Sequence, residues 1–143
     1  MTEYTIGDIT GLLPENSTYK QGDIWIADLG EALGHEQGGT RPVLIVSGTK
    51  WNAKSKTPMV CPCTTSLKKG KNYYCVKIKI GNKASYVNGS HVYTLSAKRF
   101  KTKVGTISIS KRIQIANTIK KLLYVISDST LNDSGKKKKQ KQE

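Results

Sequence analysis

The pattern of apolar and polar positions predicts a series of short strands followed by one helix. Runs of strand-forming residues bounded by turn residues predict strands at 24–29, 42–47, 58–65, 73–80, 91–95 and 103–107. In the fourth run, Tyr74, Val76, Ile78 and Ile80 share one face and lysines occupy the other. This alternation is typical of an antiparallel strand that is buried on one side only.

After residue 107 the apolar positions take up helical spacing. The predicted stripe comprises Ile109, Ile113, Ala116, Ile119 or Lys120, Leu123 and Ile126, which indicates an amphipathic helix over 109–126. Residues 48–57 are predicted to form a polar loop. Many short strands with one terminal helix predict a mainly β fold, a small barrel that the helix closes, rather than a parallel α/β sheet.

The pattern also divides the chain into parts. We expect one folded domain at 20–127, an N-terminal extension at 1–19 and a disordered basic tail at 128–143. There is no run of eighteen apolar residues and no apolar N-terminal segment that follows a basic start. We therefore expect no membrane span and no secretory signal, and the cytoplasm as the compartment.

Charge changes this picture, because the formal net charge is +14. The five lysines and one glutamate after residue 135 contribute +4, which leaves +10 for the rest of the chain. A basic body favours a polyanionic partner, with nucleic acid first and an anionic membrane surface second. A role in solubility alone is the alternative.

The three cysteines, Cys61, Cys63 and Cys75, cannot all pair, and we expect them to be small buried side chains. A metal site would need further ligands at matched spacing, so no metal is expected. The chain has no glycine-rich phosphate-binding pattern of the Walker or dinucleotide type, so no nucleotide cofactor is expected either.

Candidate chemistry concentrates in residues 34–42, Gly-His-Glu-Gln-Gly-Gly-Thr-Arg-Pro, just before the second predicted strand. If the ligand is RNA, its own 2′-hydroxyl can attack the neighbouring phosphorus without a metal, given a base, an acid and a cation. Arg41 suits the phosphate and Thr64 can donate a hydroxyl to it, while His35 and Glu36 are candidate proton carriers. Alternatively, Arg41 forms an ion pair with Glu36 or Asp28.

A second group of interest is the basic turn that contains Lys68, Lys69 and Lys71. It is either a solvated turn or, with the adjacent Tyr73 and Tyr74, a contact for single-stranded RNA. The residues alone therefore predict a basic β-barrel that binds nucleic acid.

Three segments together resemble the MazF/PemK (Kid) family of toxins from bacterial type II toxin–antitoxin modules. They are Gln-Gly-Asp-Ile-Trp-Ile-Ala-Asp-Leu at 21–29, Gly-His-Glu-Gln-Gly-Gly-Thr-Arg-Pro-Val-Leu-Ile-Val at 34–46 and Met-Val-Cys-Pro-Cys-Thr at 59–64. The resemblance covers residues 20–126. It implies a small SH3-like β-barrel (CcdB/MazF-like) with a C-terminal helix, a homodimer, and a cognate antitoxin protein as partner.

The resemblance also implies an activity, which is metal-independent and sequence-selective cleavage of single-stranded RNA to a 2′,3′-cyclic phosphate and a 5′-hydroxyl. Arg41 and Thr64 match the family's catalytic arginine and threonine, and His35 matches a contributing histidine of the Kid branch. RNA contacts are expected from Glu36, Gln37, Thr65, Ser66, Lys68 and Lys69.

One departure from the Kid branch leaves the general base open. That branch carries an Arg-x-Asp pair on a later strand, where this chain has His-Val-Tyr-Thr-Leu-Ser at 91–96. We expect His91 itself to be structural. The alternatives are a nucleic-acid-binding regulator that does not cleave, or a CcdB-like poison of DNA gyrase on the same fold.

Overall fold

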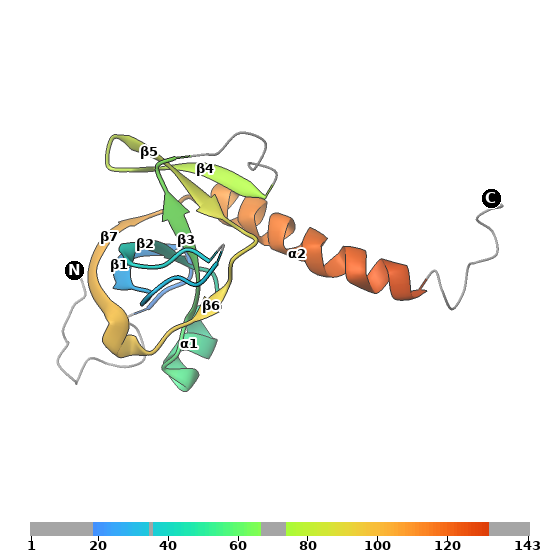
Figure 1. The fold of residues 1–143 in the computed structure, drawn as a ribbon, viewed down its shortest axis with the longest axis horizontal. Coiled ribbons are helices and arrows are strands. Elements are labelled where there is room, and N and C mark those ends of the chain that lie inside the picture. Colours follow the sequence, from blue (N-terminus) through green and yellow to red (C-terminus); the bar gives the residue numbers. More distant parts are fainter. Residues whose placement is uncertain (1–18, 35, 67–73, 132–143) are drawn as a thin grey trace.

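The computed structural model of the protein describes residues 19–34, 36–66 and 74–131, with side chains described up to residue 123. Figure 1 shows a curled sheet from which the C-terminal helix extends to one side. The elements in chain order are β1 (Asp23–Asp28), β2 (Thr40–Ile45), α1 (Thr49–Ser55), β3 (Met59–Thr64), β4 (Cys75–Ile80), β5 (Lys83–Asn88), β6 (Tyr93–Thr94), the 3-10 turn η1 (Ala97–Arg99), β7 (Phe100–Thr106) and α2 (Ile109–Leu131).

All strand pairings among the described residues are antiparallel, in the order β4-β5-β3-β2-β1-β7, and β6 also pairs with β3. The strand β3 joins the two halves of the sheet, because its first part pairs with β2 and its last two residues, Cys63 and Thr64, pair with β5. This mainly β half-barrel with a C-terminal helix confirms the predicted fold class.

The central strands are buried on both faces, because two hydrophobic cores lie on opposite sides of β2 and β3. Leu44 and Cys61 belong to the first core, which α2 and the β4–β5 hairpin cover. Val43 and Val60 belong to the second core. There, Trp25 packs edge-on against Phe100, with ring centroids 5.9 Å apart. The absence of alternation in the second and third predicted strands follows from this double burial.

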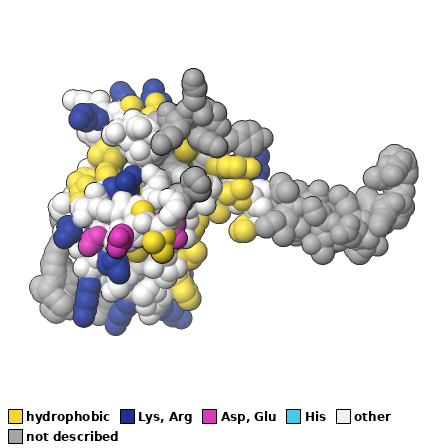
Figure 2. Space-filling view, viewed as in Figure 1, with side chains coloured by type: hydrophobic (Ala, Val, Ile, Leu, Met, Phe, Trp, Pro, Cys, Tyr) yellow, Lys and Arg dark blue, Asp and Glu magenta, His cyan; other side chains and the backbone are white. Residues whose placement is uncertain are grey.

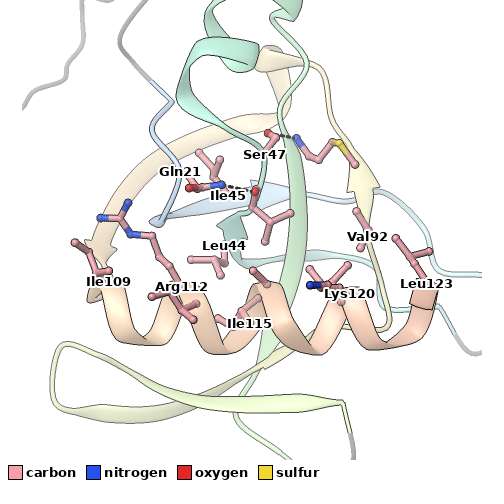
Figure 3. A pocket seen from close by; sticks show the side chains of 15 residues that line it. Gln21, Leu44, Ile45, Ser47, Val92, Ile109, Arg112, Ile115, Lys120 and Leu123 are labelled. Atoms are coloured by element: carbon pink, nitrogen blue, oxygen red, sulfur yellow. Dashed lines mark hydrogen bonds between the residues drawn. The ribbon is translucent and has the colours of Figure 1, made fainter. Parts of the chain in front are cut away.

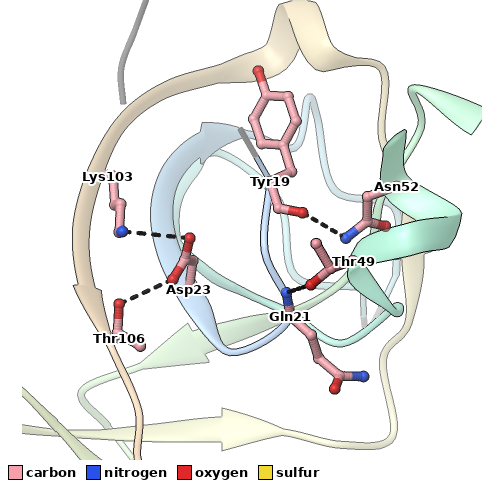
Figure 4. Close-up of polar contacts among 7 residues, drawn as sticks. All are labelled: Tyr19, Gln21, Asp23, Thr49, Asn52, Lys103 and Thr106. Carbon is pink, nitrogen blue, oxygen red and sulfur yellow. Dashed lines mark hydrogen bonds and ion pairs between the residues drawn. The ribbon is translucent and has the colours of Figure 1, made fainter. Parts of the chain in front are cut away.

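A buried carboxylate ties β1 to its neighbour in the sheet, β7. Asp23 on β1 is only 3% exposed. One of its oxygens lies 3.4 Å from Lys103 Nζ, and the other accepts a hydrogen bond of 2.9 Å from the Thr106 hydroxyl, both on β7 (Figure 4). Burial without such partners would cost several kcal/mol, so these contacts help to hold β7 in register.

The predicted inward face of α2 is wrong in part. Ile109, Ile113 and Leu123 are 64%, 55% and 64% exposed, whereas Ile115 is 2% exposed and lies in the first core with Ile119 packed against it. The helix presents two neighbouring apolar stripes, and the core takes the one that contains Ile115. The helix also runs to Leu131, beyond the predicted end at 126.

Residues 48–57 were predicted as a loop, and this prediction is wrong, because Thr49–Ser55 form α1. Asn52 anchors this helix. It is buried, and its Nδ2 donates to the Tyr19 carbonyl at 2.8 Å (Figure 4). Its Oδ1 accepts from the Ser47 hydroxyl. A single buried amide does not produce helical periodicity in the sequence, so the pattern did not predict the helix.

The strand boundaries after residue 80 also differ from the prediction. The strand β5 was not predicted, because alanine, serine, lysine and asparagine form strands weakly. It exists because it pairs with β4 on one side and β3 on the other. The strand expected at 91–95 is reduced to β6, whereas the one expected at 103–107 begins earlier, as β7. No helix of the described chain is both long and apolar enough to span a membrane.

Candidate functional site

Arg41 and Thr64 lie on the neighbouring strands β2 and β3, beyond the last residue pair of the ladder that joins these strands. Val43 pairs with Pro62 in the β2–β3 ladder, and the same register continued by two residues sets Arg41 opposite Thr64. Opposed residues of antiparallel strands share a face. For this pair it is the face of the second core, and both side chains are half-buried where that core reaches the end of the sheet.

The guanidinium of Arg41 is held by the backbone rather than by an acid. Its Nε donates to the Gly38 carbonyl at 2.9 Å. Asp28 instead accepts from the Gly30 amide at 2.9 Å, and Glu36 from the Leu33 amide at 3.2 Å. Among the described residues no carboxylate lies within 4.0 Å of Arg41, so the ion pairs considered from the sequence are not formed. The planar end of the side chain is thus available for an anion.

The loop that precedes Arg41 is shaped by a close approach of its two ends. Gly39 donates to the Gly30 carbonyl at 2.7 Å, and the Leu29 amide donates to the Gly39 carbonyl at 2.9 Å. A Cβ at Gly38 would lie 2.6 Å from the Gly30 carbonyl oxygen, and Gly39 has φ +80°. The chain turns sharply at these two glycines, and this turn fixes the carbonyl that holds Arg41.

Gln37 is held by hydrogen bonds to Tyr93 and Asn88. Its backbone amide donates to the Tyr93 hydroxyl at 3.3 Å, and that hydroxyl donates to the Gln37 carbonyl at 2.9 Å. Its side-chain oxygen accepts from Asn88 Nδ2 at 3.0 Å. Of the two loop residues expected to contact RNA, Glu36 is exposed and Gln37 is half-buried.

The hydroxyl of Thr64 lies in a tight turn at the end of β3. Its Oγ1 accepts from the Ser66 amide at 3.2 Å and donates to the Ser66 carbonyl at 3.3 Å. Thr65 and Ser66 are exposed beside it. His35, Lys68 and Lys69 lie outside the described residues.

Four residues near the site carried no clear functional signal in the sequence. Tyr86 is the β5 partner of Thr64. Asn88 and Tyr93 hold Gln37, and the ring of His91 lies edge-on to that of Tyr93 at 6.3 Å. These residues reach the site only through the path of the chain between β5 and β6. The one signal in the sequence that could have identified them is the group of aromatic and amide side chains around the Asn88-Gly89 turn.

The nearby thiols are neutral. Burial raises the pKa of both Cys61 and Cys63 to about 12, and the positive charge of Arg41 only partly opposes this for Cys63. A neutral, buried thiol is a poor nucleophile. Cys61 and Cys63 are thus the small buried side chains that were predicted, whereas Cys75 is only half-buried. Within the described part of the chain, no three His, Cys, Asp or Glu side chains gather in a way that would hold a metal ion.

Comparison with known proteins identifies relatives that span most of the chain. Residues 20–123 match the family described as PemK-like, MazF-like toxin of type II toxin–antitoxin system. Endoribonuclease MazF from Staphylococcus epidermidis is 35% identical over 104 residues, which cover 70% of this chain and 87% of that protein.

Solved structures agree in fold. MazF (form I) from Deinococcus radiodurans superposes with a TM-score of 0.65 at 22% identity, over 73% of this chain and 94% of that one. An endoribonuclease in complex with its cognate antitoxin, from a mycobacterial species, gives a TM-score of 0.60 at 21% identity, over 73% and 93%. On its sequence match and its fold, this chain belongs to the PemK-like, MazF-like family of toxins of type II toxin–antitoxin systems.

Proposed function

We propose that the protein is a toxin that cleaves single-stranded RNA, messenger RNA in particular, at selected sequences and without a metal or the ribosome. The RNA's own 2′-hydroxyl attacks the adjacent phosphorus, and the products are a 2′,3′-cyclic phosphate and a 5′-hydroxyl. The relative from Staphylococcus epidermidis that is named an endoribonuclease supports this activity. Cleavage of this kind in the bacterial cytoplasm would stop translation and growth.

In this proposal Arg41 and Thr64 bind the scissile phosphate. The guanidinium offers a planar pair of donors and stays protonated, so it can neutralise the charge that builds up on the phosphorane oxygens. The Thr64 hydroxyl donates to the same group. His35 assists, and RNA contacts come from Glu36, Gln37, Thr65, Ser66, Lys68 and Lys69. Two observations support the proposal: the β2–β3 register, which by extrapolation sets Arg41 opposite Thr64, and the absence among the described residues of an acid paired to the arginine.

The test is cleavage of a long RNA by the purified protein in EDTA. We expect Arg41→Ala to lower kcat/KM by about 100-fold or more, as loss of an oxyanion-type donor does. Arg41→Lys should recover little, because an ammonium cannot form the two-donor fork.

Thr64→Val should also lower kcat, and Thr94→Val is its matched control, because Thr94 is exposed on β6. Unchanged cleavage by Arg41→Ala, or dependence of the wild-type reaction on added metal, would contradict the proposal. A DNA supercoiling assay with gyrase, run in parallel, tests the CcdB-like alternative.

We further propose a cognate antitoxin as protein partner. Structural neighbours include MazE–MazF from Deinococcus radiodurans, which supports a partner of this kind. A small acidic protein whose disordered segment covers the RNA-binding face would complement a chain of net charge +14.

The exposed stripe of α2 supports a homodimer. It borders an apolar groove of about 760 Å³ between the helix and the β2–β3 strands (Figure 3). In Figure 2, hydrophobic side chains gather where the described part of α2 leaves the sheet. The same surface thus carries both a groove and protruding side chains, Ile109, Ile113 and Leu123. A twofold interface needs such self-complementarity, so we propose a second copy as the occupant.

Sedimentation of the full chain tests this interface. Ile113→Glu should shift the protein from dimer to monomer, because it buries a carboxylate in an apolar contact. Asn117→Glu, on the same helix but outside the groove, should leave the dimer intact. A monomeric wild type, or equal dissociation by both variants, would rule this surface out.

A further inference from the structure

A row of four side chains crosses the sheet at the level of the candidate site. Thr64 on β3 pairs with Tyr86 on β5, and Tyr86 pairs with Lys77 on β4. On the other side of Thr64, the continued β2–β3 register adds Arg41. Since paired residues share a face, all four lie on one side of the sheet, at right angles to the strands. With strands about 4.8 Å apart, the row is about 14 Å long.

The far end of this row is rich in lysine. Lys79 lies on the same face as Lys77, two residues along β4, and its pairing partner Ala84 is small and exposed. Both lysines are exposed, and Figure 2 shows Lys and Arg side chains over the β4–β5 hairpin. Beyond the free edge of β4 is a recess of about 410 Å³ whose lining includes Lys77, Lys79 and Lys111 and no carboxylate.

Tyr86 lies between this charge and the candidate catalytic pair. It is half-buried, so part of the residue is open to solvent. An anchored aromatic ring offers a flat surface to a base, and flanking lysines hold the phosphates, which is how single strands are bound without sequence readout.

We propose that single-stranded RNA crosses the strands along this row, with the base next to the scissile phosphate stacked on Tyr86 and the following phosphates bound by Lys77 and Lys79. The inference rests on the proposed RNA cleavage, whose site it extends. It assigns substrate binding to the β4–β5 hairpin, whose residues take no part in the chemistry.

The experiment measures binding and cleavage separately. Binding uses the full chain and a fluorescein-labelled, random-sequence oligonucleotide with 2′-O-methyl groups, which lacks the attacking hydroxyl and cannot be cut. The variants are Lys77→Ala with Lys79→Ala, Tyr86→Ala and Tyr86→Phe. Lys83→Ala is the matched control, because Lys83 is an exposed lysine of the same hairpin on the opposite face, paired with Ile80. Circular dichroism and the urea midpoint verify folding of each variant.

We expect the double lysine variant to make the slope of log K against log salt shallower by about 1.4, the value for two lost phosphate contacts to a single strand. Tyr86→Ala should weaken binding by about 10- to 100-fold, whereas Tyr86→Phe keeps the ring and binds like the wild type. In cleavage of long RNA, these variants should raise KM and leave kcat unchanged.

Two results would overturn the inference. One is an unchanged salt slope and affinity in the double lysine variant and in Tyr86→Ala. The other is an equal loss in Lys83→Ala, which would indicate a response to total charge alone. Failure of the proposed function would give a different result. The wild-type protein would then not cut RNA, and this outcome is independent of how the hairpin variants change binding.

Discussion

At the scale of single residues, the site depends on a glycine that has no chemistry of its own. Gly38 supplies the carbonyl that receives Arg41 Nε, and it lies against the backbone at Gly30 and Ala32. Arg41 is thereby oriented by the path of the main chain rather than by a charged partner. The loop must keep its shape for the guanidinium to face a phosphate.

We predict that Gly38→Ala lowers RNA cleavage at least tenfold. The new Cβ would lie 2.6 Å from backbone atoms at both Gly30 and Ala32, so the loop has to shift and Arg41 loses its acceptor. The measurement is kcat/KM on long RNA together with the urea midpoint, since overpacking costs about 1–3 kcal/mol.

Gly48→Ala is the control for this prediction, because a Cβ at Gly48 meets nothing within 4 Å and its φ is −64°. If Gly38→Ala cleaved RNA as fast as the control does, the loop would not be what orients Arg41.

At the scale of elements, α2 shows which parts of the fold were readable from the sequence. The helix itself was predicted from its period. Its buried face was not, because Ile115 and Ile119 form one stripe at helical spacing while Ile109, Ile113 and Leu123 form another. Local periodicity cannot distinguish a stripe that meets the chain's own core from one left exposed, since that depends on where the sheet lies.

The same limit explains the other differences. Arg41 and Thr64 were predicted as a pair because each lies in a short sequence motif that can be recognised without knowledge of the strand pairing. Tyr86 and Lys77 were not, because their relation to Thr64 exists only through the pairing of β3, β5 and β4. The sequence of β5 itself forms a strand weakly, so the row across the sheet required the structure.

The assignment of the α2 faces leads to a stability prediction. Ile115→Ala should lower the free energy of unfolding by about 2–5 kcal/mol, because it removes buried methyl groups from the first core. The control is Gln114→Ala at the neighbouring, exposed position, which should change the free energy of unfolding by less than about 0.5 kcal/mol. Urea denaturation measures both, and equal values would mean that this face of α2 is not packed.

At the scale of the whole molecule, two cores share the central strands, and neutral thiols lie in one of them. Cys61 and Cys63 are 0% and 1% exposed. Burial favours the uncharged form of each thiol, which keeps it protonated in the folded protein at pH values where an exposed thiol ionises.

We predict a loss of stability at alkaline pH that depends on these thiols. The pKa of each thiol rises from 9.0 to about 12 on folding, so the unfolded chain releases these protons first as the pH rises. The stability that the two protonated thiols contribute to the folded state is therefore complete below pH 9 and is lost as the pH approaches 12. The slope is at most about 1.4 kcal/mol per pH unit for each thiol.

The check is the free energy of unfolding from pH 8 to pH 11, a range that spans the onset of this loss. The variant with Cys61→Ala and Cys63→Ala should be less stable overall yet show a shallower decline, since it lacks the two buried thiols. Parallel curves for the two proteins would contradict the prediction.

The burial of β2 on both faces has a consequence for how the protein meets its substrate. A strand at the centre of the sheet, enclosed by two cores, exposes its amides to hydrogen exchange only when the domain opens globally. Deuterium uptake in β2 should therefore be among the slowest in the chain. The buried half of β2, Val43 to Ile45, is thus preorganised before any ligand arrives, and little conformational entropy is lost there on binding.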